Sequence, residues 1–188
     1  MATALIVLDV QTGTVPKVPA ATSPTYLPTL SNTISHARTA GVKIIFIRVC
    51  FRPSYPEIST SNPMFAKLID SNMYLEGTPE VEIHPALGCD VSKGDIIVNK
   101  RRISGFAGSD LEVLLRGMRV QKVVLAGLVT SGTVLGTAYE ASDRDFGVTV
   151  LRDLCKDREE ELNEIVLEKV LAKVAIVQSS EEWLKGLV

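Results

Sequence analysis

Short runs of almost purely apolar residues recur along this chain and are separated by segments with helical spacing. The first run, residues 4–8, contains no polar residue, so both faces of the strand that it predicts must be buried. Five further runs follow, at residues 42–49, 96–98, 123–126, 148–151 and 174–177. Strands buried on both faces form parallel sheets between two helical layers. The pattern predicts an α/β fold, a three-layer α/β/α structure whose six-stranded parallel sheet has the Rossmann-like order 3-2-1-4-5-6.

Helices are predicted between these runs, where apolar residues recur every three or four positions. The residues expected to face inward are Leu27, Leu30, Ile34 and Ala37, then Leu111, Leu114 and Leu115, then Val134, Leu135, Ala138 and Ala141, and finally Leu162, Ile165, Val166 and Val170. Ser109 is the expected N-cap of the second helix. A short last helix is expected near Trp183.

The segment from residue 52 to about residue 94 differs from this regular pattern. Prolines are scattered through it, among them those at positions 53, 56, 63 and 79, and a short helix is expected around residues 64–69. Excursions of this length in a compact domain are usually functional or disordered. Apolar residues between the prolines favour an ordered flap, which makes the segment a candidate lid.

Composition narrows the class of protein. With 188 residues, 46% of them hydrophobic, the chain is expected to form one domain over residues 1–188. Lys and Arg number 20 against 22 Asp and Glu, without a basic run, so neither nucleic acid nor a membrane is an expected partner. The first ten residues lack the basic start of a signal peptide, and we expect a cytoplasmic protein. Three unpaired cysteines and two histidines indicate reduced thiols, and no metal or cofactor is expected.

One strand-turn-helix stretch, residues 123–138, stands out. Its strand runs into a turn with three hydroxyls, those of Thr130, Ser131 and Thr133, directly before the helical spacing begins. Backbone N–H groups at such a helix start suit an anion or a developing oxyanion. An ordinary capped loop explains the same residues equally well.

Two charged residues are expected at the same edge of the sheet as this turn. Asp9 ends the first apolar run and Lys100 follows the third, and sites in open α/β sheets lie at the carboxyl ends of the strands. Asp9 follows five apolar residues, so we expect it to be partly buried with Lys100 as its partner. The sequence contains no G-x-G-x-x-G after the first strand, no phosphate-binding loop and no G-x-S-x-G elbow.

Four segments in this order resemble the isochorismatase-like hydrolases, also called the cysteine hydrolase family. They are residues 8–11 (LDVQ), 48–57 (RVCFRPSYPE), 100–106 (KRRISGF) and 127–134 (GLVTSGTV), each after a predicted strand. The resemblance implies a catalytic Asp, Lys and Cys, of which the first two correspond to Asp9 and Lys100, and a cis peptide bond between Leu128 and Val129. The cysteine position holds Thr133.

This departure bears on the chemistry that the resemblance implies. A Thr hydroxyl is far less acidic than a thiol, so we do not expect efficient attack on a carbonyl. Cys50, at a strand end, is a weak candidate for a substitute. Isochorismatases of the family also lack this cysteine. They hydrolyse a vinyl ether, turning isochorismate into pyruvate and a dihydroxy-dihydrobenzoate. The leading hypothesis is therefore this reaction, with Asp9 as general acid and Lys100 offsetting the carboxylates of a small anionic substrate.

Two alternatives stay open, an amidase or acyl hydrolase that uses Thr133 and a non-catalytic binding protein on the same fold. The residues expected to bind substrate are Gln11, Arg48, Arg52, Tyr55, Glu57, Phe106, Leu128, Val129, Ser131 and Gly132. For Arg52, Tyr55 and Glu57 the alternative is a loop packed on itself, and for Phe106 it is a core aromatic. Residues 52–57 lack the Asp-x-His cluster of family metal sites. By resemblance, we expect a homo-oligomer, a dimer or a tetramer.

Overall fold

Six parallel strands form the centre of the protein in a computed structural model that describes residues 2–187. They are β1 Ala2–Leu8, β2 Lys43–Val49, β3 Ile96–Lys100, β4 Val120–Leu128, β5 Gly147–Lys156 and β6 Ile176–Gln178. Neighbouring strands pair in the order β3-β2-β1-β4-β5-β6 and every pair is parallel. The predicted fold class and strand order are confirmed.

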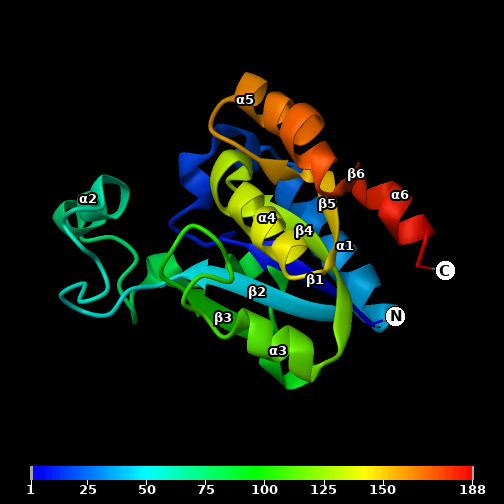
Figure 1. Ribbon diagram of the computed structural model, residues 1–188, viewed down its shortest axis with the longest axis horizontal. Coiled ribbons are helices and arrows are strands. Elements are labelled where there is room, and N and C mark those ends of the chain that lie inside the picture. The colour runs from blue at the N-terminus through cyan, green and yellow to red at the C-terminus, as the bar shows by residue number, and fades with distance from the viewer. Residues whose placement is uncertain (1, 188) are drawn as a thin grey trace.

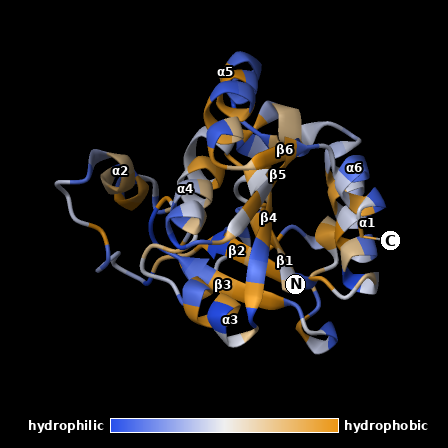
Figure 2. Ribbon diagram, turned by 45° about the vertical axis from the view of Figure 1, so that its right-hand side comes forward, coloured by the Kyte–Doolittle hydropathy of each residue, from blue (hydrophilic) through white to orange (hydrophobic). Residues whose placement is uncertain are grey.

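Helices cover both faces of this sheet (Figure 1). They are α1 Tyr26–Thr39, α2 Pro63–Ser71, α3 Leu111–Gly117, α4 Leu135–Asp143, α5 Glu160–Ile165 and α6 Ser180–Lys185. Figure 2 shows α1 and α6 beside each other on one face, with their apolar sides turned to the strands. Helices α3 and α4 and the segment that follows α5 pack on the other face.

The alternation of side chains along β1 explains the two cores. Leu5 and Val7 pack with α1 on one face, whereas Ile6 and Leu8 pack with α3 and α4 on the other. All four side chains are fully buried. An uninterrupted apolar run is therefore what a central strand between two helical layers requires.

Two local predictions were wrong. Leu162 and Ile165 were expected to face inward, but they are 38% and 42% exposed. The buried stripe consists of Asn163, Val166, Leu167 and Leu171, so a polar residue takes the inward position that was expected for Leu162, and Leu167 is buried in place of Ile165. The helix continues after α5 as a π-helical turn, Val166–Val170. The residue before α3 is Asp110 rather than Ser109, although the Ser109 hydroxyl still accepts a hydrogen bond from the amide of Leu111 at 3.2 Å.

The flap between β2 and β3 carries α2, which projects from the body of the molecule beyond the carboxyl end of β2 (Figure 1). It has a small core of its own, formed by Phe51, Tyr55, Phe65, Tyr74 and Val81 among others. Isolated bridges from Gln11 to Ile83 and from Phe51 to Leu75 fix its base. Among residues 2–187, no helix has both the length and the apolar character that crossing a membrane requires.

Candidate active site

Asp9, Lys100 and Thr133 meet at the carboxyl edge of the sheet. The ammonium of Lys100 lies 2.8 Å from Asp9 Oδ2 and donates to Thr133 Oγ1 at 3.2 Å. The Thr133 hydroxyl donates to the same Asp9 oxygen at 2.8 Å. Three groups from distant parts of the chain therefore share one hydrogen-bonded cluster, and the predicted proximity of Asp9 and Lys100 is what the structure shows.

The backbone around Asp9 brings these groups together. Asp9 follows β1 with a φ of 53°, and its amide donates to the carbonyl of Ile47 in β2 at 2.9 Å. On the other side, Gly127 of β4 has a φ of 132°, and a Cβ there would lie 2.1 Å from the carbonyl oxygen of Leu8. Only glycine permits this approach. It lets β4 come close enough to β1 for the following turn to lie over Asp9.

Burial sets the electrostatics of the cluster. The side chains of Asp9 and Lys100 are only 9% and 4% exposed. Burial raises the pKa of Asp9 above its ordinary value of 3.8, and the Lys100 ammonium and the Thr133 hydroxyl, which both lower it, offset this only in part. The three N–H groups of Lys100 have three acceptors, because its Nζ also donates to the carbonyl of Arg102 at 3.0 Å. The cluster therefore places the Lys100 ammonium beside a carboxyl that protonates more readily than usual.

The turn after β4 carries fewer free donors than its sequence suggests. The peptide bond between Leu128 and Val129 is cis, which confirms that prediction, and a π-helical turn, Thr130–Val134, follows. The carboxylate of Asp157 accepts the Ser131 amide at 2.6 Å, and the Thr130 hydroxyl donates to Asn163 at 2.6 Å.

Two further amides of the turn, those of Gly132 and Val134, donate to the carbonyl of Val129 at 3.2 Å. The Ser131 amide is thus occupied by the protein's own carboxylate. Three amides of this turn, those of Ser131, Gly132 and Val134, therefore have acceptors within the described protein and are not free for an oxyanion.

A cavity of about 150 Å³ opens onto the cluster. Its lining consists of Asp9, Thr14, Val49, Met64, Phe65, Leu68, Tyr74, Lys100, Arg102, Ile103, Leu128, Val129, Gly132, Thr133 and Arg158. Most of this wall is apolar, and part of it comes from α2, so the flap forms one side of the cavity. An apolar pocket with a few convergent polar groups is the usual form of a small-molecule site.

Of the residues expected to bind substrate, Leu128, Val129 and Gly132 line this cavity. Gln11 is fully buried, and its carboxamide forms hydrogen bonds with the backbone of Val49 and Val81. It therefore supports the site without lining it, and the same holds for Ser131, whose amide is held by Asp157.

Four more of the expected residues lie in the flap or at its base and are bound to other groups. The guanidinium of Arg48 donates to Asn99 at 2.7 Å and to Glu82 at 2.9 Å. Arg52 pairs with Glu57 at 2.5 Å. The Tyr55 hydroxyl donates to the carbonyl of Met73 at 2.7 Å. Arg48, Arg52, Tyr55 and Glu57 do not line the cavity, in keeping with the alternative interpretation of a loop packed on itself.

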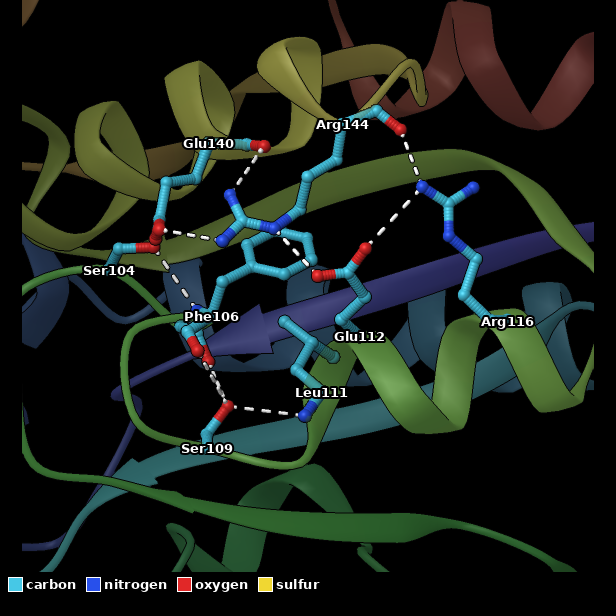
Figure 3. Close-up of polar contacts among 9 residues, drawn as sticks. Ser104, Phe106, Ser109, Leu111, Glu112, Arg116, Glu140 and Arg144 are labelled. Carbon is cyan, nitrogen blue, oxygen red and sulfur yellow. Dashed lines mark hydrogen bonds and ion pairs between the residues drawn. The ribbon is translucent and has the colours of Figure 1, made fainter.

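Phe106 lies in the core beside α4 rather than at the cavity (Figure 3). Its ring centroid is 6.0 Å from that of Phe146, and the guanidinium of Arg144 lies 5.0 Å above it. Glu112 and Glu140 hold that guanidinium by ion pairs of 2.9 and 3.1 Å. The alternative interpretation, a core aromatic, describes the position of Phe106.

Sequence reasoning missed two arginines and the contribution of α2. Arg102 follows β3 by two residues and Arg158 follows β5 by two, so both reach the same edge as Asp9. The rule that placed Lys100 there would have placed them too. The sequence predicts a short helix around Met64, Phe65 and Leu68, and α2 is that helix. Nothing in the sequence, however, fixes the direction in which the helix folds back over the cavity.

None of the three cysteines replaces the thiol at position 133. Cys50 is buried and does not line the cavity, and burial raises the pKa of its thiol. Burial likewise raises the pKa of Cys155 to about 12. Within the described part of the chain, no three His, Cys, Asp or Glu residues are grouped closely enough to hold a metal ion.

Comparison with known proteins agrees with this geometry. The isochorismatase domain matches residues 3–182. The isochorismatase family protein YecD of Escherichia coli O157:H7 is 28% identical, with 98% of this chain and 96% of YecD aligned. Maleamate amidohydrolase of Pseudomonas putida is 25% identical over 80% of this chain and 69% of its own. A cysteine hydrolase from Pseudomonas syringae pv. phaseolicola superposes with a TM-score of 0.89 at 21% identity, covering 98% of this chain and 92% of the other. The chain belongs to the isochorismatase family of hydrolases.

Proposed function

We propose that this protein hydrolyses the vinyl ether of a small carboxylate such as isochorismate, forming pyruvate and a dihydroxy-dihydrobenzoate without a covalent enzyme intermediate. The observation that carries the proposal is the Asp9 carboxyl, buried beside Lys100 at a cavity that offers no thiol. Water is the nucleophile in this reaction, so the threonine at position 133 is no obstacle to it.

Asp9 acts first as an acid. Its pKa is raised by burial, so a larger fraction of the carboxyl is protonated than in water, as proton donation requires. The proton passes to the terminal carbon of the vinyl group, which leaves an oxocarbenium ion at the ether carbon. Water adds to this ion and loses a proton to Asp9, and the resulting hemiketal collapses to a ketone and an alcohol. Each cycle consumes one water molecule and returns the Asp9 proton.

The charges around the cavity suit an anionic substrate. Arg102 and Arg158 both line it, and no carboxylate of the described chain lies within ion-pair distance of either guanidinium. Lys100 adds a third positive charge beside the reacting carboxyl. Guanidinium groups bind carboxylates with two parallel hydrogen bonds. At this cavity Arg102 and Arg158 are thus the expected partners of a substrate carboxylate, because neither Arg48 nor Arg52 lines it.

The direct test is incubation with isochorismate while pyruvate is measured by a coupled dehydrogenase. We expect turnover that is lost in the Asp9→Asn variant and kept in Arg119→Gln, which removes a charge just before β4, at the far edge of the sheet. Pyruvate formation no faster than in Asp9→Asn would overturn the proposal.

Amide hydrolysis through Thr133 is the second candidate. Two observations favour it: the Thr133 hydroxyl donates to Asp9 at 2.8 Å, as a nucleophile does to its base, and maleamate amidohydrolase is among the similar proteins. The hydroxyl would form an ester with the acyl group while the amine leaves, and water would release the acid. Ammonia release from maleamate tests this, and a Thr133→Val variant with unchanged release would exclude it.

A further inference from the structure

We infer that a second cavity, next to the reaction cavity, binds a second anionic group of the substrate. It has a volume of about 430 Å³ and is lined by Arg52, Glu57, Arg101, Arg102, Ala107 and Gly108. We call it the arginine pocket. The inference rests on the proposed function only in taking the cavity at Asp9 as the place where substrate reacts.

Arg102 connects the two cavities because it lines both. Its guanidinium lies 5.7 Å from the ring of Phe65 in α2, and it donates to the carbonyls of Arg101 at 2.6 Å and Glu57 at 2.9 Å. These contacts hold the side chain between the flap and the loop after β3. The arginine pocket is therefore the place that we infer an extension of the substrate past Arg102 would reach.

The arginine pocket carries three guanidinium groups against one carboxylate, Glu57. Arg52 and Arg101 both approach the same oxygen, Oε1, at 2.5 and 2.9 Å. The other oxygen of Glu57 is buried and accepts no hydrogen bond from the described residues. One carboxylate cannot neutralise three guanidiniums, so the pocket has a surplus of positive charge that an anion would offset.

The hydrogen-bond donors of the arginine pocket are also in surplus. A guanidinium has five N–H groups. Arg101 Nε is buried and lacks a hydrogen-bond acceptor among residues 2–187, because its contact with Glu57 does not have hydrogen-bond geometry. The Arg101 side chain as a whole is 20% exposed, so water reaches the guanidinium only in part and does not reach Nε. Unpaired donors on a largely buried cation are costly unless a ligand supplies the acceptors.

The walls of the arginine pocket leave room for such a ligand. Ala107 and Gly108 have little or no side chain, and a Cβ at Gly108 would meet no atom within 4 Å. The group that fits this combination of space, positive charge and planar donors is a carboxylate or a phosphate. The substrate class is therefore a molecule with one anionic group near Asp9 and a second one separated from it by a spacer.

Binding of unreactive dicarboxylates measures this without turnover. Calorimetric titration with succinate, adipate and suberate is compared with monocarboxylates of the same lengths. We expect the second carboxylate to strengthen binding about tenfold or more once the spacer reaches the arginine pocket, and much less for succinate. A 5-phosphonopentanoate arm, which has the same four-methylene spacer as adipate, shows whether the distal group is a phosphate or a carboxylate, and tighter binding of either over the monocarboxylate supports the inference.

Variants separate this site from the reaction site. Arg52→Gln and Arg101→Gln are expected to remove most of the advantage of the second carboxylate, whereas the matched charge loss Arg119→Gln leaves it intact. Glu57→Gln, which releases two guanidiniums, is expected to increase it. If Glu57 only supported the structure of the pocket, Glu57→Gln would instead decrease the advantage of the second carboxylate.

Equal binding of mono- and dicarboxylates at every length would overturn the inference, and so would an unchanged preference in both Arg52→Gln and Arg101→Gln. Arg52 is 56% exposed, so its variant serves where Arg101→Gln does not fold. A protein that forms no pyruvate but shows the length-dependent preference would refute the proposed reaction and support the arginine pocket. Pyruvate formation without the length-dependent preference would support the proposed reaction and overturn the inference about the arginine pocket.

Discussion

Replacement of Thr133 by valine distinguishes the two proposed reactions. Valine has nearly the same shape as threonine but lacks the hydroxyl that donates to Asp9 Oδ2 at 2.8 Å and accepts from Lys100 at 3.2 Å. The direct contact between Lys100 and Asp9 at 2.8 Å remains in the variant. The perturbation therefore removes the possible nucleophile while it leaves the acid and its cation in place.

The size of the effect follows from these contacts. A hydrogen bond to a charged group is worth about 1.5–3 kcal/mol, and 1.4 kcal/mol corresponds to about a tenfold change in rate. With water as nucleophile, Thr133→Val should lower turnover by no more than about 10- to 100-fold. Loss of a covalent nucleophile costs far more, about 10⁴-fold or above. The pKa of Asp9 should also rise, because burial remains and a donor that lowers it is gone.

The assay is pyruvate release from isochorismate and ammonia release from maleamate by the same preparations, across pH. A general acid is lost when it ionises, so vinyl-ether hydrolysis should fall as the pH rises through the Asp9 pKa, and Thr133→Val should shift that fall to higher pH. Thr133→Ser, which keeps the hydroxyl, is the matched control. A drop of 10⁴-fold in pyruvate release by a folded Thr133→Val variant would refute the reasoning.

Three further predictions concern the same cluster. Lys100→Met should cost about 3–5 kcal/mol of stability, measured by urea unfolding, and should raise the Asp9 pKa further, because Asp9 stays buried but loses the ammonium. Gly127→Ala places a Cβ 2.1 Å from the Leu8 carbonyl oxygen and should cost about 3 kcal/mol or more, and a smaller loss would show that β4 can move away from β1. Because the folded Asp9 pKa lies above 3.8, the folded chain binds more protons than the unfolded one between the two pKa values. The Asp9 contribution to the free energy of unfolding should therefore fall as pH rises through that interval, seen as the difference between wild type and Asp9→Asn, and a rising difference would contradict the raised pKa.

Apolar runs determined the predictable part of this fold. A strand such as residues 4–8 can be buried on both faces only between two helical layers, so the layers and the edge that carries Asp9 and Lys100 followed from the pattern. The helix after β5 was less predictable. Its inward face includes Asn163, which is buried because it accepts a hydrogen bond from the Thr130 hydroxyl, and a pattern of apolar residues carries no sign of a buried polar one.

The walls of the site were predicted less well than its centre, for a physical reason. Arg48 lies close in sequence to the expected pocket, but Glu82 binds it from the far end of the flap. That pairing depends on how a loop of more than 40 residues folds back, which local propensities do not fix. The pair of Arg52 and Glu57 is local, and the sequence left it open beside a role in binding. Strand ends point to one edge regardless of loops, and this is why Asp9 and Lys100 could be placed.

The position of the flap depends on the carboxamide of Gln11, which must both donate and accept hydrogen bonds. Its nitrogen donates to the carbonyls of Val49 at 3.0 Å and Val81 at 2.9 Å, while its oxygen accepts the Val49 amide at 2.9 Å. The carboxamide thus makes the hydrogen bonds that the backbone of a neighbouring strand would make, and it joins β2 to the end of the flap that returns toward the sheet. A carboxylate of the same shape would set oxygen against oxygen at two of these contacts, and a shorter amide would not reach. A single uncharged side chain of one length therefore keeps the flap, and with it the wall contributed by α2, in register with the edge of the sheet that carries Asp9 and Lys100.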